Sequence, residues 1–436
     1  MSEPVTLAIV GAGKRGQAYA AYATAHPEQL RVVAVAEPRQ LLRERLAAAH
    51  GLGVDVCFDD YEALAAAGKL ADAVAICTQD RMHLAPVELL APLGYAILLE
   101  KPMSPHLAEC EQIIACIRRH GNLFAVCHVL LYTELTTKLR EIVRSGTIGE
   151  IVSVQHLEPV GWWHQAHSFV RGNWGNQQQS SPMLLSKSCH DIDWLRHIVN
   201  AHCTSVASFG SLRHFKASEK QAGAAERCWD CQVEANCPYS AKRIYHSHFE
   251  RDRVANYIND VITGGLNTLA AVEDALRHGP YGRCVYACDN DVVDHQTVML
   301  EFEGPVSVTF TMTAFTPTLN RSTRIFGTRG YIDTDFVTIK VFDFLTEKET
   351  LHDTRIGADA ATAAAGHGGG DYFIMQAFVR ALATGDSSGI WSGPEATLES
   401  HRIVFAAEQA RLEKRVVHVR TPNLNSVLSG DRIKQS

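Results

Sequence analysis

The feature that most constrains this chain is a glycine-rich turn close to its N-terminus. Residues 7–10 form an apolar run, the sequence GAGKRG follows at residues 11–16, and small helix-favouring residues come next. This order predicts a strand, a tight turn and a helix whose N-terminus can hold a pyrophosphate. The glycines permit the turn, the approach of phosphate to bare backbone, and helix packing on the strand. The expected contacts of a dinucleotide here are Gly11, Gly13, Lys14, Arg15 and Gly16.

An acidic residue ends the second predicted strand. Residues 32–36 after Arg31 are apolar, and Glu37 follows them, 21 residues beyond Gly16. A carboxylate at this place accepts hydrogen bonds from the adenosine ribose and repels a 2′-phosphate, so the sequence predicts NAD rather than NADP. Arg39 lies close enough to neutralise a phosphate, which leaves NADP as the alternative coenzyme.

The composition narrows the class of protein and its partners. The chain has 436 residues, 41 basic and 48 acidic, with a formal charge of −7 and no block of like charge. Neither nucleic acid nor a membrane surface is therefore an expected partner, and a small molecule is. No apolar run is long enough to span a membrane, and a strand already begins near residue 7, so we expect no signal peptide and a cytoplasmic protein.

Two domains are predicted. Residues 1–128 alternate apolar strands with helices and should form a parallel Rossmann sheet, an α/β fold. Residues 129–436 should form an α+β domain with a large open antiparallel sheet, because residues 151–157, 296–302, 306–313 and 331–342 alternate with period two. Ligands bind beyond the carboxyl ends of parallel strands. The polar residues expected at that edge are Thr78, His83, Glu100, Lys101 and His128.

Two segments carry candidates for proton transfer. Lys101, in a Glu-Lys-Pro sequence with a candidate cis proline, follows the fourth apolar run of the first domain. Lys187, His190 and Asp191 lie near one another at a predicted helix start in the second domain. A solvated lysine and a self-capping helix are the alternatives if each segment is taken alone.

Taken together, these motifs resemble the glucose-fructose oxidoreductase / inositol dehydrogenase (Gfo/Idh/MocA) family. The resemblance implies association through the exposed face of the second sheet, as a homodimer or homotetramer. It also implies that Lys101 and His190 flank the substrate carbon beside nicotinamide C4. The motifs that carry it are the glycine turn, Cys77-Thr78 with His83, Glu100-Lys101-Pro102, His190-x-x-Asp193 and Ser400-His401.

The chain departs from the family at two positions. The family commonly has an aspartate four residues before the histidine and a glycine two before it, where this chain has Ser186 and Ser188. The departure makes Lys187 a candidate to take over part of the missing role and weakens the case for simple alcohol dehydrogenation.

A polar and aromatic insert is the expected substrate-binding segment. Aromatic rings pack on the C–H faces of sugars, and cationic groups suit an anionic substituent, although a tryptophan taken alone is as often a core residue. The candidate substrate-binding residues are Trp162, Trp163, His164, His167, Arg171, Asn173 and Trp174, with Asp191.

A second insert, at about residues 216–252, contains Cys228, Cys231 and Cys237. Three thiolates at this spacing can bind structural zinc, and a small insert gains folding energy from a metal. His214 is the first choice for the fourth ligand, and His246, His248 and Cys189 are alternatives. Three buried free cysteines are the competing interpretation.

Three functions remain open. The first is NAD-dependent oxidation of a secondary alcohol of a sugar, cyclitol or glycoside. The second is an NAD-dependent glycosidase that oxidises C3, eliminates the aglycone, adds water and reduces the sugar again, as some relatives of the family do; its substrate could be an anionic sugar such as a sulfoquinovoside. The third is a non-catalytic NAD-binding regulator, which the presence of Lys101 and His190 disfavours.

Overall fold

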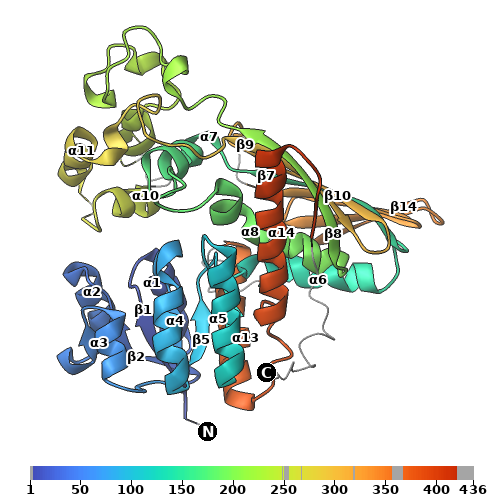
Figure 1. Ribbon diagram of the computed structural model, residues 1–436, viewed down its shortest axis with the longest axis horizontal. Coiled ribbons are helices and arrows are strands. Elements are labelled where there is room, and N and C mark those ends of the chain that lie inside the picture. The colour runs from blue at the N-terminus through green and yellow to red at the C-terminus, as the bar shows by residue number, and fades with distance from the viewer. Residues whose placement is uncertain are drawn as a thin grey trace, which may run out of the picture.

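The computed structural model describes residues 3–247, 249, 255–266, 268–317, 320–355 and 367–419. Figure 1 shows three parts: an N-terminal domain at the lower left, a sheet and its helices at the right, and a helical insert above the N-terminal domain. Among the described residues, no helix is long and apolar enough to cross a membrane.

The N-terminal domain is a parallel six-stranded sheet in the order β3-β2-β1-β4-β5-β6, with helices on both faces. Its central strands are buried along their whole length, because helices cover both sides of the sheet. The strands are β1 (Val5–Val10), β2 (Leu30–Ala36), β3 (Cys57–Phe58), β4 (Ala73–Ile76), β5 (Ala96–Leu99) and β6 (Phe124–Val126), and the helices are α1 (Lys14–Ala25), α2 (Gln40–His50), α3 (Tyr61–Ala66), α4 (Leu84–Leu90) and α5 (Leu107–His120).

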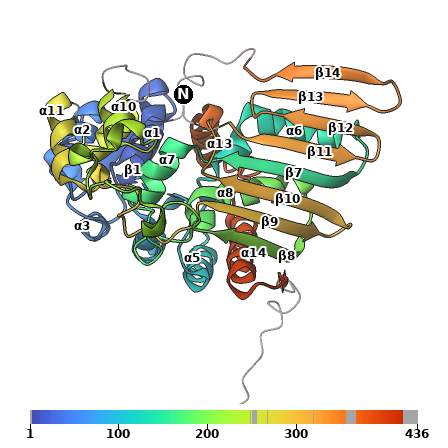
Figure 2. The ribbon, with the colours of Figure 1, turned by 90° about the horizontal axis from the view of Figure 1, so that it is seen from above.

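The second sheet has nine strands in the order β14-β13-β12-β11-β7-β10-β9-β8-β15, which Figure 2 shows from above. The expectation of an antiparallel sheet needs a correction, because β7 and β10 pair in parallel and the sheet is mixed. The strands are β7 (Ile151–Pro159), β8 (Cys203–Ser211), β9 (His295–Phe302), β10 (Val306–Thr313), β11 (Ser322–Gly327), β12 (Gly330–Thr334), β13 (Thr338–Asp343), β14 (Lys348–Asp353) and β15 (Val417–His418).

One face of this sheet carries helices and the other carries exposed apolar side chains. On β9, Val298 and Leu300 are buried, whereas Met299 between them is 56% exposed, as the alternation of a strand requires. Helix α14 also contacts α5, so it joins the sheet to the N-terminal domain. The helices of the covered face are α6 (Glu134–Arg144), α8 (Met183–Val199) and α14 (Pro394–Glu413), whereas α13 (Gly370–Thr384) packs on α1 and β1 of the N-terminal domain.

Two sequence-based boundaries were wrong. Residues 331–342 are not one strand but the hairpin of β12 and β13, because Asp335 accepts backbone bonds from Val337 and Thr338, at 3.0 and 2.7 Å, and Phe336 has a φ of +65°. Helix α8 begins at Met183, so Lys187 and His190 lie inside the helix rather than at its start.

The two predicted inserts form one layer with residues that follow them in the chain. This layer has a core of its own, in which Phe215 and Tyr245 are fully buried. Its elements are α7 (Trp162–His164), the π-helices η5 (Gln165–Arg171) and η9 (Lys242–His246), the 3-10 helices η6 (Ala217–Glu219), η7 (Cys228–Asp230), η8 (Glu234–Asn236) and η10 (Pro280–Gly282), and the helices α10 (Ala255–Ile262) and α11 (Leu269–His278).

Candidate functional site

The glycine turn has the geometry that a dinucleotide needs. Gly11 has a φ of +94°, and a Cβ on it would lie 2.7 Å from the carbonyl oxygen of Cys77. A Cβ on Gly16 would lie 2.1 Å from the carbonyl oxygen of Gly11, so close packing of α1 on β1 requires glycine there. Gly13 caps α1 without a side-chain hydrogen bond, which leaves the first amides of the helix for an anion.

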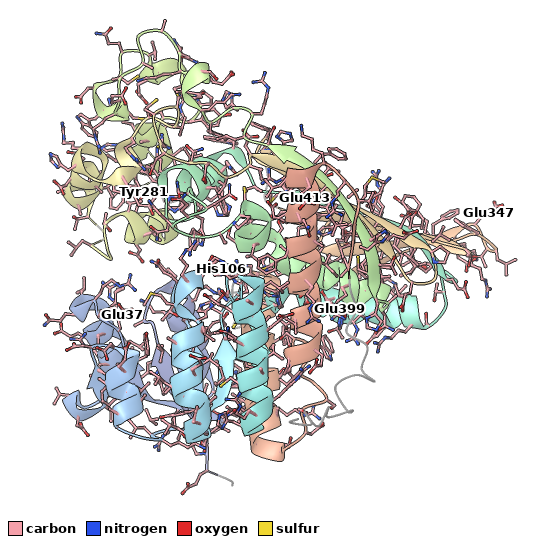
Figure 3. The ribbon with its side chains drawn as sticks, viewed as in Figure 1. Glu37, His106, Tyr281, Glu347, Glu399 and Glu413 are labelled. Carbon is pink, nitrogen blue, oxygen red and sulfur yellow. The ribbon has the colours of Figure 1, made fainter. Side chains whose placement is uncertain are left out.

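Glu37 lies at the carboxyl end of β2, and Figure 3 shows it on the side of the N-terminal domain that faces the insert. The carboxylate is almost fully buried and accepts a hydrogen bond of 2.8 Å from the backbone N–H of Ala12. Burial acts to raise the pKa of Glu37, but bonds from Arg39, of 2.7 Å to Oε1 and 2.8 Å to Oε2, lower it overall. Glu37 is therefore an anion, and its carboxylate partly neutralises Arg39, the cation that the sequence suggested for a 2′-phosphate.

Arg15 and Glu100 form a structural link rather than an open cofactor contact. Arg15 Nε donates to Glu100 across 2.6 Å, and its two Nη atoms donate to Asp371 of α13 across 2.9 and 2.7 Å. The second oxygen of Glu100 accepts the backbone N–H of Lys101 at 2.8 Å. These bonds hold α1, the end of β5 and α13 together. Lys14 pairs with Asp260 of α10, which brings the insert to the glycine turn.

The histidines near the end of β5 fix the loop that carries Lys101. His83 is buried, with Nδ1 lying 2.9 Å from the carbonyl oxygen of Pro102, and the Lys101–Pro102 peptide is cis, as expected. Thr78 donates its hydroxyl to the carbonyl of Met82, at 2.8 Å, in the neighbouring turn.

His128 is buried at the same edge, and neither ring nitrogen has a hydrogen-bond partner among the described residues. Burial, and after it the charge of Lys101, lowers the pKa of His128 to about 3. A neutral imidazole therefore lies beside the Lys101 loop.

Lys101 reaches across the boundary between the two domains. Its Nζ donates to the backbone carbonyl of Ser186 on α8. Ser186 lies at the position where the family commonly has aspartate. Lys101 therefore contacts a backbone carbonyl oxygen at this position and has no carboxylate beside it there. The structure thus brings Lys101 to the helix that carries Lys187 and His190.

A buried ion network surrounds the α8 residues, and two of its members were missed by the sequence analysis. Lys187 Nζ lies 3.0 Å from Glu158 Oε1 of β7, and Arg321 Nε lies 2.9 Å from Glu158 Oε2. Arg321 also pairs with Asp191, which is fully buried and holds the arginine in place. Side chains alternate between the two faces of a strand, so Glu158 in β7 and Arg321, directly before β11, lie on the covered face of the sheet. The positions of these two residues relative to the buried apolar residues nearby could have indicated this from the sequence.

His190 is held as a neutral ring. Its pKa lies well below the ordinary value, because burial and the charges of Arg321 and Lys101 outweigh the attraction of Asp191. Arg321 donates to Nε2 across 3.0 Å, so the proton of the neutral ring lies on Nδ1. Nδ1 is buried and has no hydrogen-bond partner among the described residues. His190 can therefore donate that proton to a hydroxyl or carbonyl oxygen of a substrate.

The aromatic insert contributes fewer residues to this site than expected. His164 lies closest to it: burial, followed by the charge of Lys187, lowers the pKa of its imidazole. Trp163 packs on His164 with ring centroids 5.5 Å apart, and Trp162 is half-buried against Tyr239. Asn173 and Trp174 are exposed beyond the π-helix.

His167 and Arg171 lie in the core of the insert, contrary to the expectation of an anion-binding role. His167 stacks on Tyr281 and has its Nδ1 3.1 Å from the hydroxyl of Tyr245. Arg171 is 2% exposed and donates to two backbone carbonyls of the insert, each at 2.7 Å. One turn of π-helix carries both side chains inward, which residue spacing did not indicate.

The predicted zinc ligands are only partly brought together. Cys228, Cys231 and Cys237 line one small cavity, which His214 does not line. His214 Nε2 instead lies 3.0 Å from the hydroxyl of Tyr286. Of the alternatives, His246 faces Glu273, Cys189 is buried in α8, and His248 lies outside the described residues. No group of three or more His, Cys, Asp or Glu side chains that could hold a metal occurs in the described part of the chain.

The architecture and the motifs agree with the match to family models. Residues 5–128 match the oxidoreductase family with an NAD-binding Rossmann fold, and residues 140–419 match its C-terminal alpha/beta domain. The chain belongs to the Gfo/Idh/MocA family. It is therefore an enzyme of the oxidoreductase type with an NAD-binding domain.

Individual relatives of this Gfo/Idh/MocA protein are distant. A 2,7-anhydro-N-acetylneuraminate hydratase of Escherichia coli K12 is 25% identical over 147 residues, 34% of this chain and 38% of that protein. A D-glucoside 3-dehydrogenase of the same organism is 29% identical over 150 residues, 34% of this chain and 42% of that protein. The aligned parts thus span less than half of either relative.

Solved structures extend the comparison over nearly the whole chain. Levoglucosan dehydrogenase in complex with NADH and levoglucosan has a TM-score of 0.69 and 16% identity, over 96% of this chain and all of that one. At this identity the likeness shows a shared fold.

Proposed function

We propose that the protein transfers a hydride between NAD and a secondary alcohol carbon of a sugar, cyclitol or glycoside. One observation carries the proposal: Lys101, at the carboxyl end of β5, reaches the helix that presents Lys187 and His190. Two domains thus supply proton-transfer groups at the edge of the sheet where a nicotinamide binds. The named activities of the two sequence relatives, both on sugar-type molecules, support the substrate class.

The residues of the first domain fit NAD. The pyrophosphate would lie on the open helix N-terminus at Gly13. The adenosine ribose would bond to Glu37 in place of bonds from Arg39, because the carboxylate already accepts four hydrogen bonds, one from Ala12 and three from Arg39. Thr78, Glu100 and His128 would lie beside the nicotinamide end of the dinucleotide. Glu100 would contribute by holding Arg15 in position. When bound, NAD supplies the hydride acceptor.

The chain's own residues would manage the proton. Lys101 Nζ would exchange its bond to the Ser186 carbonyl for one to the reacting hydroxyl. As the neutral amine it would take the hydroxyl proton while the carbon loses its hydride, and it would become an ammonium group. His190 Nδ1 would donate to the same oxygen and hold it in place. Lys187, fixed by Glu158, would supply positive charge beside the oxygen that becomes a carbonyl.

The charges around the site favour electron-rich substrates. Lys187 and Arg321 are paired with the carboxylates of Glu158 and Asp191, so Lys101 adds a net positive charge to the site once it has taken the substrate proton. The sequence predicted Arg171 as the arginine near the substrate, and the structure has Arg321 near His190 instead. Arg321 is paired with the carboxylates of Glu158 and Asp191. This balance suits a hydroxyl-rich sugar and tolerates an anionic one.

The test is an assay with purified protein, NAD and a panel of sugars, cyclitols and aryl glycosides, with and without an anionic substituent. Net formation of NADH, followed by absorbance, is the expected result. The dehydrogenase proposal fails if no compound that binds gives NADH or consumes it in reverse.

A second candidate is the redox-neutral glycosidase. The extra lysine on α8 and the hydratase relative favour it, because elimination needs a base for the C2 proton after C3 has been oxidised. The hydride then returns from NADH to C3 after water has added at C1, so no net NADH forms. Release of the aglycone without net NADH would support this reaction and reject the dehydrogenase.

The assembly and the setting of the enzyme are part of the proposal. We place residues 1–128 in the NAD-binding domain and 129–436 in the substrate-binding and oligomerisation domain. A homodimer or homotetramer would bury the open sheet face, on which Phe209 and Met299 are 66% and 56% exposed. A cytoplasmic location would suit twelve cysteines, none of them in a disulfide.

A further inference from the structure

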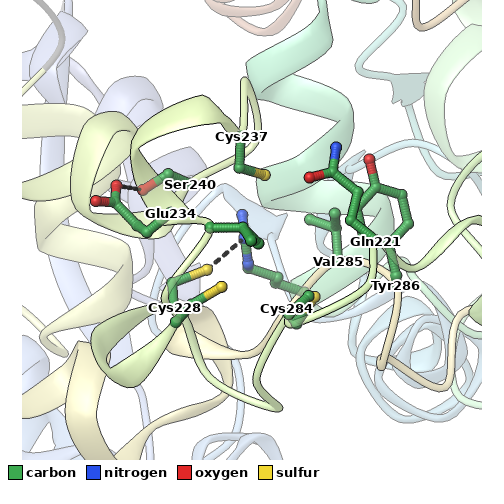
Figure 4. Close-up of a pocket in the computed structure, with 12 residues that line it drawn as sticks. Gln221, Cys228, Glu234, Cys237, Ser240, Cys284, Val285 and Tyr286 are labelled. Atoms are coloured by element: carbon green, nitrogen blue, oxygen red, sulfur yellow. Dashed lines mark hydrogen bonds between the residues drawn. The ribbon is translucent and has the colours of Figure 1, made fainter.

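Four cysteines surround one cavity inside the insert, and Figure 4 shows it in close-up. The cavity has a volume of about 20 Å³. Three of the thiols, those of Cys228, Cys231 and Cys237, come from the segment with short 3-10 turns. The fourth is Cys284, 47 residues further along the chain, which the sequence analysis did not consider.

A backbone pairing explains how Cys284 reaches the others. Arg227 and Arg283 form an isolated antiparallel bridge, and the N–H of Cys284 donates to the carbonyl of Glu226 at 2.9 Å. Cys228 and Cys284 each follow directly after a member of that bridge. The turn from Cys228 to Cys231 is closed by a backbone bond of 3.4 Å, so this pair also shares one end of the cavity.

A buried cation lines the same cavity. Arg171 is 2% exposed, and its described partners are the carbonyls of Arg283 and Tyr239 and the sulfur of Cys228, at 3.5 Å. Its Nη1 is buried and has no hydrogen-bond partner among the described residues. The carboxylate of Glu234 lines the same cavity but accepts a bond from Ser240, and among the described residues Arg171 forms no ion pair. A guanidinium buried without a paired anion is costly, so a further negative charge in this cavity would stabilise it.

We propose that Cys228, Cys231, Cys237 and Cys284 bind one Zn²⁺ and that Arg171 balances the charge of the thiolates. Four thiolates around one divalent ion carry a net charge of −2, which gives the buried guanidinium an anionic partner. A cavity of this volume holds about one water-sized species, which favours a single ion over a four-iron cluster. Four protein ligands leave no open position, so the ion is structural.

The ion would also explain the fold of this segment. The described thiols do not yet converge on one point, and binding would release their protons and draw them together. The chain around them has only three-residue 3-10 turns as regular structure, so metal binding would supply folding energy that backbone hydrogen bonds do not. His214 is not needed as a ligand, because its ring is packed among Phe215, Tyr239 and Tyr286.

Metal analysis of the full chain tests the proposal. The protein is purified without chelator and without added metal, and its metals are measured by mass spectrometry. We expect one bound zinc per chain in the wild-type protein. The zinc content should fall at least tenfold in Cys231→Ser and Cys284→Ser and should not change in His214→Ala. Cys288→Ser is the matched control, because Cys288 lies four residues from Cys284, with its sulfur 3.3 Å from the carbonyl of Cys284, but does not line the cavity.

A second measurement covers variants that fail to fold. The wild-type chain is stripped of metal under mild conditions and titrated with Co²⁺, and intense visible bands of a tetrahedral thiolate site are expected at one equivalent. Zinc that stays in Cys284→Ser, or wild-type protein with neither zinc nor a Co²⁺ spectrum of this type, would overturn the proposal. Neither result depends on the activity of the enzyme.

Discussion

Arg321 donates a hydrogen bond to Nε2 of His190 across 3.0 Å. The bond joins residues 131 positions apart in the sequence and sets the tautomer of the histidine, since a guanidinium can only donate. The same arginine lies against Glu158 and Asp191, so one side chain connects β7, α8 and the start of β11. The nitrogen that carries the proton of His190 is thus set by an arginine that precedes a strand of the sheet.

Replacing Arg321 by Gln should lower both turnover and stability. The change leaves Glu158 and Asp191 buried with less positive charge, a loss of about 3–5 kcal/mol for a buried ion pair. The change also removes the donor that keeps the His190 proton on Nδ1, so the proton can move to Nε2. We therefore expect kcat to fall about tenfold or more. Urea unfolding and the NADH assay measure the two effects.

The matched control for this variant is Arg324→Gln. Arg324 lies on the other face of β11, is half exposed, and is 4.0 Å from Asp333, so its loss should change stability by less than about 0.5 kcal/mol. An Arg321→Gln protein as stable and as active as the control would show that the network does not support the site.

Replacing Glu37 by Ser should shift coenzyme preference toward NADP. The carboxylate now binds Arg39, and its removal both frees that guanidinium for a 2′-phosphate and deletes a ribose acceptor. The ratio of NADPH to NADH affinity should rise about tenfold or more, measured by fluorescence titration. Glu44→Ser on the exposed face of α2 should leave the ratio unchanged. Tighter binding of NADP than NAD by the wild-type protein would contradict the role given to Glu37.

Replacing Lys101 by Ala should reduce kcat by about a hundredfold or more while leaving NADH affinity within about threefold, because Lys101 acts on the substrate proton and not on the dinucleotide. His190→Ala and Lys187→Ala should show the same split, and the larger loss identifies the principal base. Lys138→Ala, on the solvent side of α6, is the control. Wild-type turnover in both Lys101→Ala and His190→Ala would remove the catalytic assignment.

The parts of the site that the sequence predicted are those held by short segments. The glycine turn, Glu37 and the Lys101 loop each depend on a strand and the few residues after it, so pattern and position are closely linked. The Rossmann topology follows from the same alternation of apolar strands and helices, and the parallel sheet is confirmed, with the two-residue β3 as an additional strand that no apolar run predicted.

The parts that the sequence did not predict depend on contacts between distant segments. Glu158 is one polar residue of β7 and Arg321 directly precedes β11, and only the pairing of β7 with β11 brings them together. Arg171 has the composition of an anion-binding residue, yet the π-helix turns it into the core. Sequence pattern gives the residue types in each case, whereas the direction of each side chain depends on tertiary packing.

The last prediction concerns acid stability, and it rests on buried neutral histidines. His128 and His401 lie with ring centroids 5.7 Å apart, and burial lowers the pKa of each to about 3. An unfolded histidine titrates near 6.5, so between about pH 6.5 and pH 3 the unfolded chain binds more protons than the folded one. The stabilisation is present above pH 6.5 and is lost as the pH falls, by up to about 1.4 kcal/mol per pH unit for each histidine.

Denaturant unfolding at pH 7 and pH 5 measures this loss, and His128→Leu isolates one ring. Because neither nitrogen of His128 has a described hydrogen-bond partner, an apolar residue of similar size should cost less than about 1.5 kcal/mol at pH 7. Removing the ring also removes its proton uptake on unfolding, so the variant should lose about 1–2 kcal/mol less than wild type between the two pH values. His278→Leu, at an exposed position at the end of α11, controls for the loss of a histidine. Equal pH dependence in wild type and His128→Leu would show that His128 is protonated alike in the folded and unfolded chains.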